Sequence, residues 1–145
     1  MKENTDQDLV DAATNVRENA YAPYSNFKVG AAVEADNGDI YVGCNVESAS
    51  YGLTVCAERV AIWKGISRGE KHFKRIAVVV DTQDLTPPCG VCRQIIWEFC
   101  GDVPVILSNL QGKTETVSAG ELLPRAFDSK FLSNAHQSGQ GTNRG

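Results

Sequence analysis

Cysteines at the starts of two predicted helices constrain the fold of this chain most strongly. Cys89 and Cys92 stand three residues apart, which places both on one face of a helix. Cys56 opens a second predicted helix, and Glu58 follows two residues later. Free amides and the helix dipole favour thiolates at a helix N-terminus. For three thiolates to bind one ion, the fold must bring these two helix N-termini together.

The donor set formed by these residues is that of an open zinc site. A catalytic zinc has three protein ligands and keeps a fourth position for water, whereas a structural zinc is closed by four. We therefore expect one Zn²⁺ per chain, bound by Cys56, Cys89 and Cys92, with Glu58 beside it as a proton carrier. Cys-Ala-Glu followed by Pro-Cys-x-x-Cys is also the three-cysteine form of the signature of zinc deaminases.

Two other interpretations of the cysteines stay open at this point. With Cys44 as a fourth ligand the site would be closed, as in a zinc-stabilised binding module, and Glu58 would have no role. If Cys89 and Cys92 formed a redox pair, Cys56 and Glu58 would be unexplained. The chain also lacks the aromatic-rich motif expected at a thioredoxin-like site.

Composition limits the substrate and the compartment. Fourteen basic and 18 acidic residues give a net charge of −4 and a pI near 5.1, the wrong sign for a protein that binds nucleic acid. Residues 1–8 lack the pattern of a secretory signal, and no apolar run is long enough to cross a membrane. We therefore expect a cytoplasmic protein with a small neutral substrate and no membrane partner. Cys44 and Cys100, outside the motifs, are expected to be buried inert thiols.

Hydrophobic patterning divides residues 1–132 into the helices and strands of one domain. We expect residues 133–145 to be a disordered tail, because they are rich in Gly, Ser, Gln and Asn. Thr5 or Asp6 is the expected cap of the first helix, and Thr54 of the second. The expected elements are a helix over 9–20, strands over 27–35 and 40–44, a helix over 55–64 ending at Gly65, a strand over 75–80, a helix over 89–99, strands over 103–107 and 114–117, and a short helix after the capping box of Ser118 and Glu121.

This order of elements predicts an α/β fold with a single mixed β-sheet of about five strands. The strands over 27–35 and 40–44 should pair antiparallel through the turn at 36–39. Helices that connect later strands must pack against the sheet, so helices are expected on both of its faces.

Five segments resemble the small homotetrameric zinc-dependent cytidine deaminases of the cytidine/deoxycytidylate deaminase superfamily. They stand in that family's order and spacing over most of the chain, at residues 21–32, 45–47, 56–59, 88–94 and 122–127. The resemblance implies that family's α/β/α sandwich. It also implies hydrolysis of cytidine and deoxycytidine to uridine and deoxyuridine with release of ammonia, a reaction of pyrimidine salvage.

The resemblance further implies roles for single residues. Cys56, Cys89 and Cys92 would bind zinc, and Glu58 would carry protons from the zinc-bound water, as hydroxide forms, to ring nitrogen N3 and the departing amine. The implied substrate contacts are Asn45 and Glu47 to the ribose hydroxyls, Phe27 and the Ala57 amide to the base, and Tyr51 and Phe127 to the pocket of a neighbouring subunit. Sites would then be shared between the subunits of a homotetramer.

Electrostatics assigns a role to Arg59 independently of the resemblance. Three thiolates leave a zinc centre with a net charge of −1, which weakens its pull on water compared with a site of neutral histidines. A guanidinium beside the thiolates draws off charge through hydrogen bonds. Arg59 is the expected partner, and Arg93, next to Cys92, is a second candidate.

Overall fold

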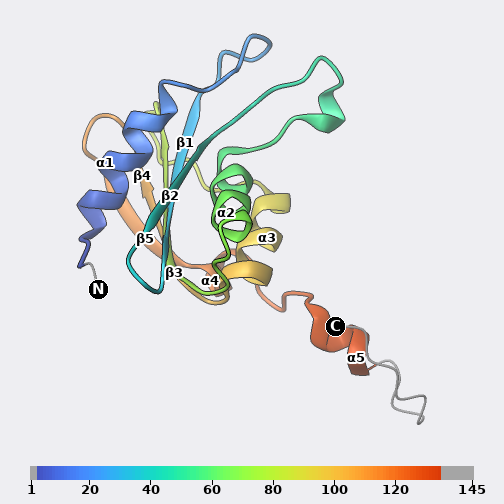
Figure 1. The fold of residues 1–145 in the computed structure, drawn as a ribbon. Coiled ribbons are helices and arrows are strands. Elements are labelled where there is room, and N and C mark those ends of the chain that lie inside the picture. Colours follow the sequence, from blue (N-terminus) through green and yellow to red (C-terminus); the bar gives the residue numbers. More distant parts are fainter. Residues whose placement is uncertain (1–2, 135–145) are drawn as a thin grey trace.

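Two buried neighbouring strands, β1 (Val29–Ala35) and β3 (Phe73–Val80), form the centre of the computed structural model, which describes residues 3–134 (Figure 1). The strand order is β2-β1-β3-β4-β5, and the outer strands are β2 (Ile40–Cys44), β4 (Pro104–Ser108) and β5 (Thr114–Ser118). Strands β3 and β4 run parallel, and the other neighbouring strands run antiparallel. The predicted mixed sheet of about five strands is confirmed.

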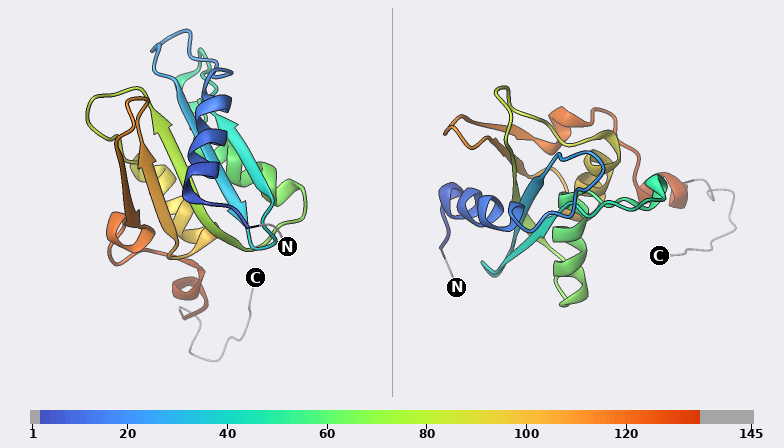
Figure 2. Two further views of the ribbon diagram at one scale, coloured as in Figure 1. Left: turned by 90° about the vertical axis from the view of Figure 1, so that its left-hand side faces the viewer. Right: turned by 90° about the horizontal axis from the view of Figure 1, so that it is seen from above.

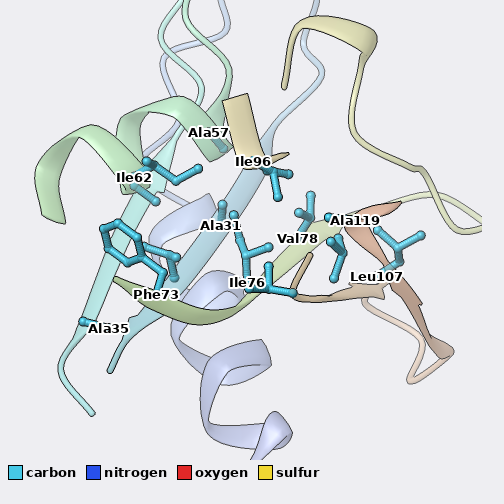
Figure 3. Close-up of a cluster of buried hydrophobic side chains, with 14 of the residues drawn as sticks. Ala31, Ala35, Ala57, Ile62, Phe73, Ile76, Val78, Ile96, Leu107 and Ala119 are labelled. Atoms are coloured by element: carbon cyan, nitrogen blue, oxygen red, sulfur yellow. The ribbon is translucent and has the colours of Figure 1, made fainter. Parts of the chain in front are cut away.

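Helices cover both faces of this sheet, also as predicted (Figures 1 and 2). Helix α1 (Asp6–Arg17) packs on one face, and α2 (Ala57–Ser67) and α3 (Gly90–Cys100) pack on the other. Side chains alternate along β1, so Ala31 and Val33 face α2 and α3 whereas Ala32 faces α1. Figure 3 shows the larger of the two cores, where Ile62 of α2 and Ile96 of α3 lie over the sheet.

Two glycines let helix backbones lie directly on the strands. A Cβ atom at Gly30 would stand 2.0 Å from the carbonyl oxygen of Ala13 in α1, and one at Gly43 would stand 2.4 Å from the amide nitrogen of Ala61 in α2. No side chain fits at such separations, so both positions require glycine. Gly43 therefore fixes how closely α2 approaches the sheet, and with α2 the cysteine at its start.

The predicted caps of the first and the last predicted helix are confirmed. Thr5 and Asp8 form a capping box at α1, and Ser118 and Glu121 form one at α4 (Ala119–Leu122). Two short helices were not predicted, η1 (Tyr51–Leu53) and α5 (Ser129–Asn134). The last two residues of α5 belong to the segment expected to be a disordered tail, and the remainder of that segment, 135–145, lies outside the described residues. No helix in the described part of the chain has the length and hydropathy to cross a membrane.

The predicted bounds of α2 are wrong at both ends. Thr54 does not cap the helix, because its hydroxyl accepts a hydrogen bond from the Ser48 amide (3.0 Å), and Cys56 is the N-cap residue. Gly65 does not end the helix. It lies within α2, and because a Cβ atom there would stand 2.8 Å from the ring of Phe73, the glycine serves the contact between α2 and β3.

A buried carboxylate ties the N-terminal segment to the sheet. Glu34 of β1 accepts hydrogen bonds from Arg75 of β3 and from the side chain of Asn4 (2.8 Å), and Lys74 Nζ lies 3.9 Å away. Arg75 also donates to Asp6 and to the main chain of Asn4. Burial opposes the charged form of Glu34, but the bonds from Arg75 and Asn4 and the two positive charges outweigh it and hold the pKa below its ordinary value of 4.5.

This lowered pKa predicts how stability depends on pH. The Glu34 carboxylate stabilises the fold fully above its ordinary pKa, and that contribution is lost as the pH falls through the lower folded pKa. The substitution Glu34→Gln should lower the free energy of unfolding at pH 7 by about 2 kcal/mol. Urea melts between pH 7 and pH 3 should then show a shallower loss of stability than in the parent protein.

The control for this comparison is Glu18→Gln, because Glu18 is an exposed carboxylate paired with Arg17 at the end of α1. It should keep the parent's pH dependence. Identical pH dependence in the parent and in Glu34→Gln would contradict the role assigned to Glu34.

Candidate metal centre and active site

The N-cap residues of α2 and α3 are both cysteines. Cys56 precedes α2 and Cys89 precedes α3, and neither sulfur forms a capping bond with its own helix. Cys92 lies in the first turn of α3 and is completely buried. The fold therefore brings the two helix N-termini together with their sulfurs free to bind a common ligand.

The three sulfurs form one cluster. The Sγ atoms of Cys56 and Cys89 are 3.8 Å apart, and all three Sγ atoms lie within 4.8 Å of one another. A tetrahedral zinc with Zn–S bonds of about 2.3 Å holds two sulfurs about 3.8 Å apart. The cluster thus fits zinc with little movement. Cys44, considered above as a fourth ligand, is not part of it.

Charge within the cluster also suits a divalent cation. The pKa of Cys56 falls to about 5 through a hydrogen bond from Cys92, with further bonds from Arg59 and Cys89, although burial opposes this. The pKa of Cys92 is raised because its thiol donates to Cys56, is desolvated, and lies beside the charge of Glu58. One thiolate therefore forms readily and a second is resisted by the first. A soft divalent cation such as zinc supplies the positive charge that further thiolates need.

Arg59, the first candidate for the charge partner of the thiolates, lies beside a cluster sulfur. Its Nη2 atom lies 3.5 Å from the Cys56 sulfur, and its guanidinium lies over the ring of Trp63 at 5.9 Å. Arg93, the second candidate, donates to the carbonyl oxygens of Pro88 (2.8 Å) and Leu122 (3.1 Å). Arg93 therefore connects backbone segments on either side of α3.

Glu58 lies in the first turn of α2 and is only 4% exposed. Burial raises the pKa of its carboxyl to about 7, and the negative charge of Cys56 acts in the same direction. Its own backbone amide, Arg59 and Cys92 offset part of this effect. A carboxyl that titrates near neutrality can both accept and donate a proton at pH 7, which is the property required of a general acid and base.

A cavity of about 300 Å³ opens beside the sulfurs and the buried carboxyl. This volume is at the lower end of the range for small-molecule sites. Among the described residues, no lysine, arginine or histidine lines it. The lining residues are Ser25, Phe27, Val29, Asn45, Glu47, Thr54, Cys56, Glu58, Val78, Val80, Thr86, Pro87 and Cys89. The cavity therefore offers no basic side chain to an anionic ligand and suits a small, partly apolar one.

Asn45, the first predicted ribose contact, lines this cavity and also shapes it. Its side chain is buried, donates to the carbonyl oxygen of Phe27 (2.7 Å) and accepts from the amide of Val29 (2.9 Å). These two bonds hold the chain that leads into β1, including Phe27, whose side chain is 43% exposed. One amide hydrogen and one lone pair of Asn45 remain for a ligand.

Glu47, the second predicted ribose contact, is held by the loop before β1. Its carboxylate accepts from the amides of Tyr24 (2.9 Å) and Ser25 (3.2 Å) and from the Ser25 hydroxyl. The Ser25 hydroxyl makes the largest contribution to lowering the pKa of Glu47. Glu47 is therefore anionic at neutral pH and is held in a fixed position at the edge of the cavity.

Three of the predicted substrate-binding residues do not line this cavity. Ala57 is completely buried at the start of α2. Tyr51 is 76% exposed, with its ring edge-on to Tyr24 at 6.1 Å. Phe127 is 55% exposed and stacks on Phe131 at 5.9 Å. The rings of Tyr51 and Phe127 thus lie outside the cavity of their own chain.

The cavity also has wall residues that the sequence analysis did not single out. Val78 and Val80 come from the end of β3, and Thr86 and Pro87 come from the loop between β3 and α3. The β-branched run at 75–80 predicted a strand, but its sequence does not indicate that Val78 and Val80 line a cavity beside the sulfurs.

The chain is similar to known proteins in both sequence and fold. Residues 3–107 match the family described as "Cytidine and deoxycytidylate deaminase zinc-binding region". A cytidine deaminase from Sporosarcina psychrophila is 50% identical over 128 residues, which cover 88% of this chain and 94% of the relative. The 1.6 Å crystal structure of cytidine deaminase from Burkholderia pseudomallei has a TM-score of 0.83 and 49% identity, over 86% of this chain and 100% of that one. A blasticidin-S deaminase from Bacillus cereus is 32% identical over 130 residues, 84% of this chain and 91% of the relative.

The sulfur cluster predicts one tightly bound zinc per chain. Elemental analysis of the purified protein should give about one zinc per 15.7 kDa chain. Cys92→Ser should lose most of it, because the change removes a soft ligand from the cluster. Cys100→Ser, a change of the half-buried thiol at the other end of α3, is the matched control and should retain the metal. Equal zinc content in the two variants would show that the cluster is not the site.

Proposed function

The chain belongs to the cytidine and deoxycytidylate deaminase family, and on that premise we propose that it is a zinc enzyme that hydrolyses cytidine and deoxycytidine to uridine and deoxyuridine. The observation that carries this proposal is the placement of the buried Glu58 beside three converging sulfurs, at a cavity of about 300 Å³. A closed structural zinc site would have no use for a proton carrier in that position.

Each part of this arrangement has a task in the reaction. Zinc bound by Cys56, Cys89 and Cys92 would lower the pKa of a water molecule to about 7, far below its value in bulk water. Glu58 takes one proton from the attacking water and donates it to N3 of the ring. It then carries the second proton of that water to the amine, which leaves as ammonia while the water oxygen becomes the new carbonyl. Its pKa of about 7 suits both transfers.

The lining of the cavity supports a neutral nucleoside as the substrate. Phe27 offers an apolar ring for the base, and Asn45 and Glu47 offer polar groups for the ribose hydroxyls. Between residues 43 and 56 the chain has no lysine or arginine. A phosphate on the 3′ hydroxyl would remove the donor that Glu47 requires and would repel its charge. We therefore propose free nucleosides, and not nucleotides or nucleic acids, as substrates.

A second candidate substrate is a modified cytosine nucleoside. The similarity to the blasticidin-S deaminase favours it, because this chain is 32% identical to that protein as well as 50% identical to a cytidine deaminase. The two candidates share the site and the reaction and differ only in what the cavity accepts. Comparing kcat/KM for cytidine with that for blasticidin S decides between them.

We also propose that the enzyme is a homotetramer whose subunits complete one another's sites. Tyr51 and Phe127 are large aromatic residues that are more than half exposed and lie outside their own cavity. Exposed aromatic rings of this size are typical of surfaces that pack against another chain.

The free cysteines of the cluster suit the reducing conditions of the cytoplasm, which is the compartment that we propose for the enzyme.

Replacing Glu58 tests the proposed chemistry. Glu58→Gln deletes the proton carrier but no metal ligand, so kcat for cytidine should fall about a hundredfold to ten-thousandfold while the zinc content stays that of the parent. The measurement is the absorbance change on deamination, with cytidine 5′-monophosphate as a comparison substrate that should react poorly. Turnover of Glu58→Gln close to that of the parent would rule out the role of Glu58.

Mixing inactive variants tests whether sites are shared. Glu58→Gln chains lack the proton carrier and Tyr51→Ala chains lack the ring, so each homogeneous preparation should be weakly active. Hybrids formed by refolding the two together should regain activity, because some sites combine an intact Glu58 with a neighbour's Tyr51. Light scattering should give four chains of 15.7 kDa. A fully active monomer, or hybrids with no regained activity, would contradict shared sites.

A further inference from the structure

We infer that Asn109 is a positioning residue that holds one wall of the substrate cavity from outside the site. Asn109 follows β4, is 5% exposed and does not line the cavity. The inference rests on the proposed function, because the wall in question belongs to the cavity in which the nucleoside is proposed to bind.

The wall is formed by the loop between β3 and α3, residues 81–89. This loop supplies Thr86, Pro87 and Cys89 to the cavity. It lies beside the turn between β4 and β5, residues 109–113, at the same end of the sheet (Figure 2). Pro87 and Pro88 have no backbone N–H to donate, so their main chain can only accept hydrogen bonds, as the Pro88 carbonyl oxygen does from the Arg93 side chain (2.8 Å).

The Asn109 amide joins the turn to the loop. Its Nδ2 atom donates to the carbonyl oxygens of Thr82 (3.0 Å) and Gln83 (3.3 Å) in the loop. Its Oδ1 atom accepts from the amides of Gln111 (3.0 Å) and Lys113 (2.9 Å) in the turn. An asparagine side chain has two N–H donors and two acceptor positions, so all four are used. One end of the amide holds the turn, and the other end holds the loop.

Further hydrogen bonds connect Thr82 to the cavity. The Thr82 hydroxyl donates to the carbonyl oxygen of Asp84 (2.6 Å), and the Thr86 hydroxyl oxygen lies 2.9 Å from that of Thr82. A hydroxyl has a single hydrogen, so Thr86 is the donor to Thr82. Asn109 fixes the backbone at Thr82, and Thr82 in turn fixes the cavity residue Thr86.

Other contacts between the turn and the loop are weaker. Gln111 Nε2 donates to the Asp81 carboxylate at 3.2 Å, and Lys113 Nζ lies 4.0 Å from the Asp84 carboxylate. Both contacts are exposed, and water weakens exposed hydrogen bonds and ion pairs. The buried Asn109 amide is therefore the principal connection between the two segments.

The substitution Asn109→Asp removes the hydrogen bonds at one end of this amide and keeps those at the other. It keeps the Oδ1 acceptor that holds the turn, but it replaces the two donors with a carboxylate oxygen that faces two carbonyl oxygens. The loop should lose its tie while the turn keeps its bonds. We expect KM for cytidine to rise about tenfold and kcat to stay within about twofold of the parent. Zinc should be retained, because Cys89 is the N-cap residue of α3 and its position also depends on that helix.

Two control variants distinguish positioning from general destabilisation. Val10→Ala removes apolar contact under α1 on the opposite face of the sheet and should lower the Tm without changing KM. Leu110→Ala changes an exposed residue of the same turn and leaves the Asn109 amide intact. An Asn109→Asp variant with the parent's KM, or an equal rise of KM in Val10→Ala, overturns the inference.

Hydrogen exchange keeps the test independent of the proposed function. In mass spectrometry, peptides covering residues 81–88 should exchange faster in Asn109→Asp than in the parent or in Val10→Ala. Should the parent protein fail to deaminate cytidine, the proposed function is wrong, and this exchange still decides whether Asn109 holds the loop. Unchanged exchange in Asn109→Asp rejects the inference even where the parent is an active deaminase.

Discussion

The site depends on two helix N-termini meeting at one point. Free amides and the dipole at each terminus favour thiolates, and Cys56 and Cys89 occupy the N-cap positions without capping their own helices. The sheet beneath sets where the helices meet, because Gly43 lets the backbone of α2 rest on β2. The positions of the sulfurs are therefore decided partly by a residue that has no side chain and does not line the cavity.

The same arrangement gives two carboxyl groups of one cavity different properties. Glu58 is buried beside the sulfurs, so desolvation and the charge of Cys56 raise its pKa to about 7. Glu47 stands at the edge, where hydrogen bonds led by that of Ser25 lower its pKa and keep it anionic. The two environments therefore suit the carboxyls to different roles: Glu58 to proton transfer, and Glu47 to a fixed polar contact with a ligand.

The residues that were predictable from sequence are those whose roles follow from local spacing. Cys89 and Cys92 share a helix face by their separation alone, and the resemblance to a known family added the residues of the cavity edge. Contacts between distant segments were not predictable. Gly65 had the pattern of a helix end, but it lies within α2, where the closeness of Phe73 leaves no room for a side chain. Asn109 had the pattern of an ordinary turn residue, and its bonds to a loop 26 and 27 positions earlier have no signature in the sequence.

The central pairing of β1 with β3 joins Ala32 to Ala77, about 45 positions along the chain. The segment between them contains β2 and α2, so Cys56 lies on a long loop that closes only when this pairing forms. Two of the thiols are close neighbours in any conformation of the chain, whereas the third joins them only after folding. Metal affinity and the folding equilibrium are therefore linked. Cys56 can add to metal affinity only in the native state, so this added affinity also stabilises the fold, and removing the metal lowers the free energy of unfolding by the same amount.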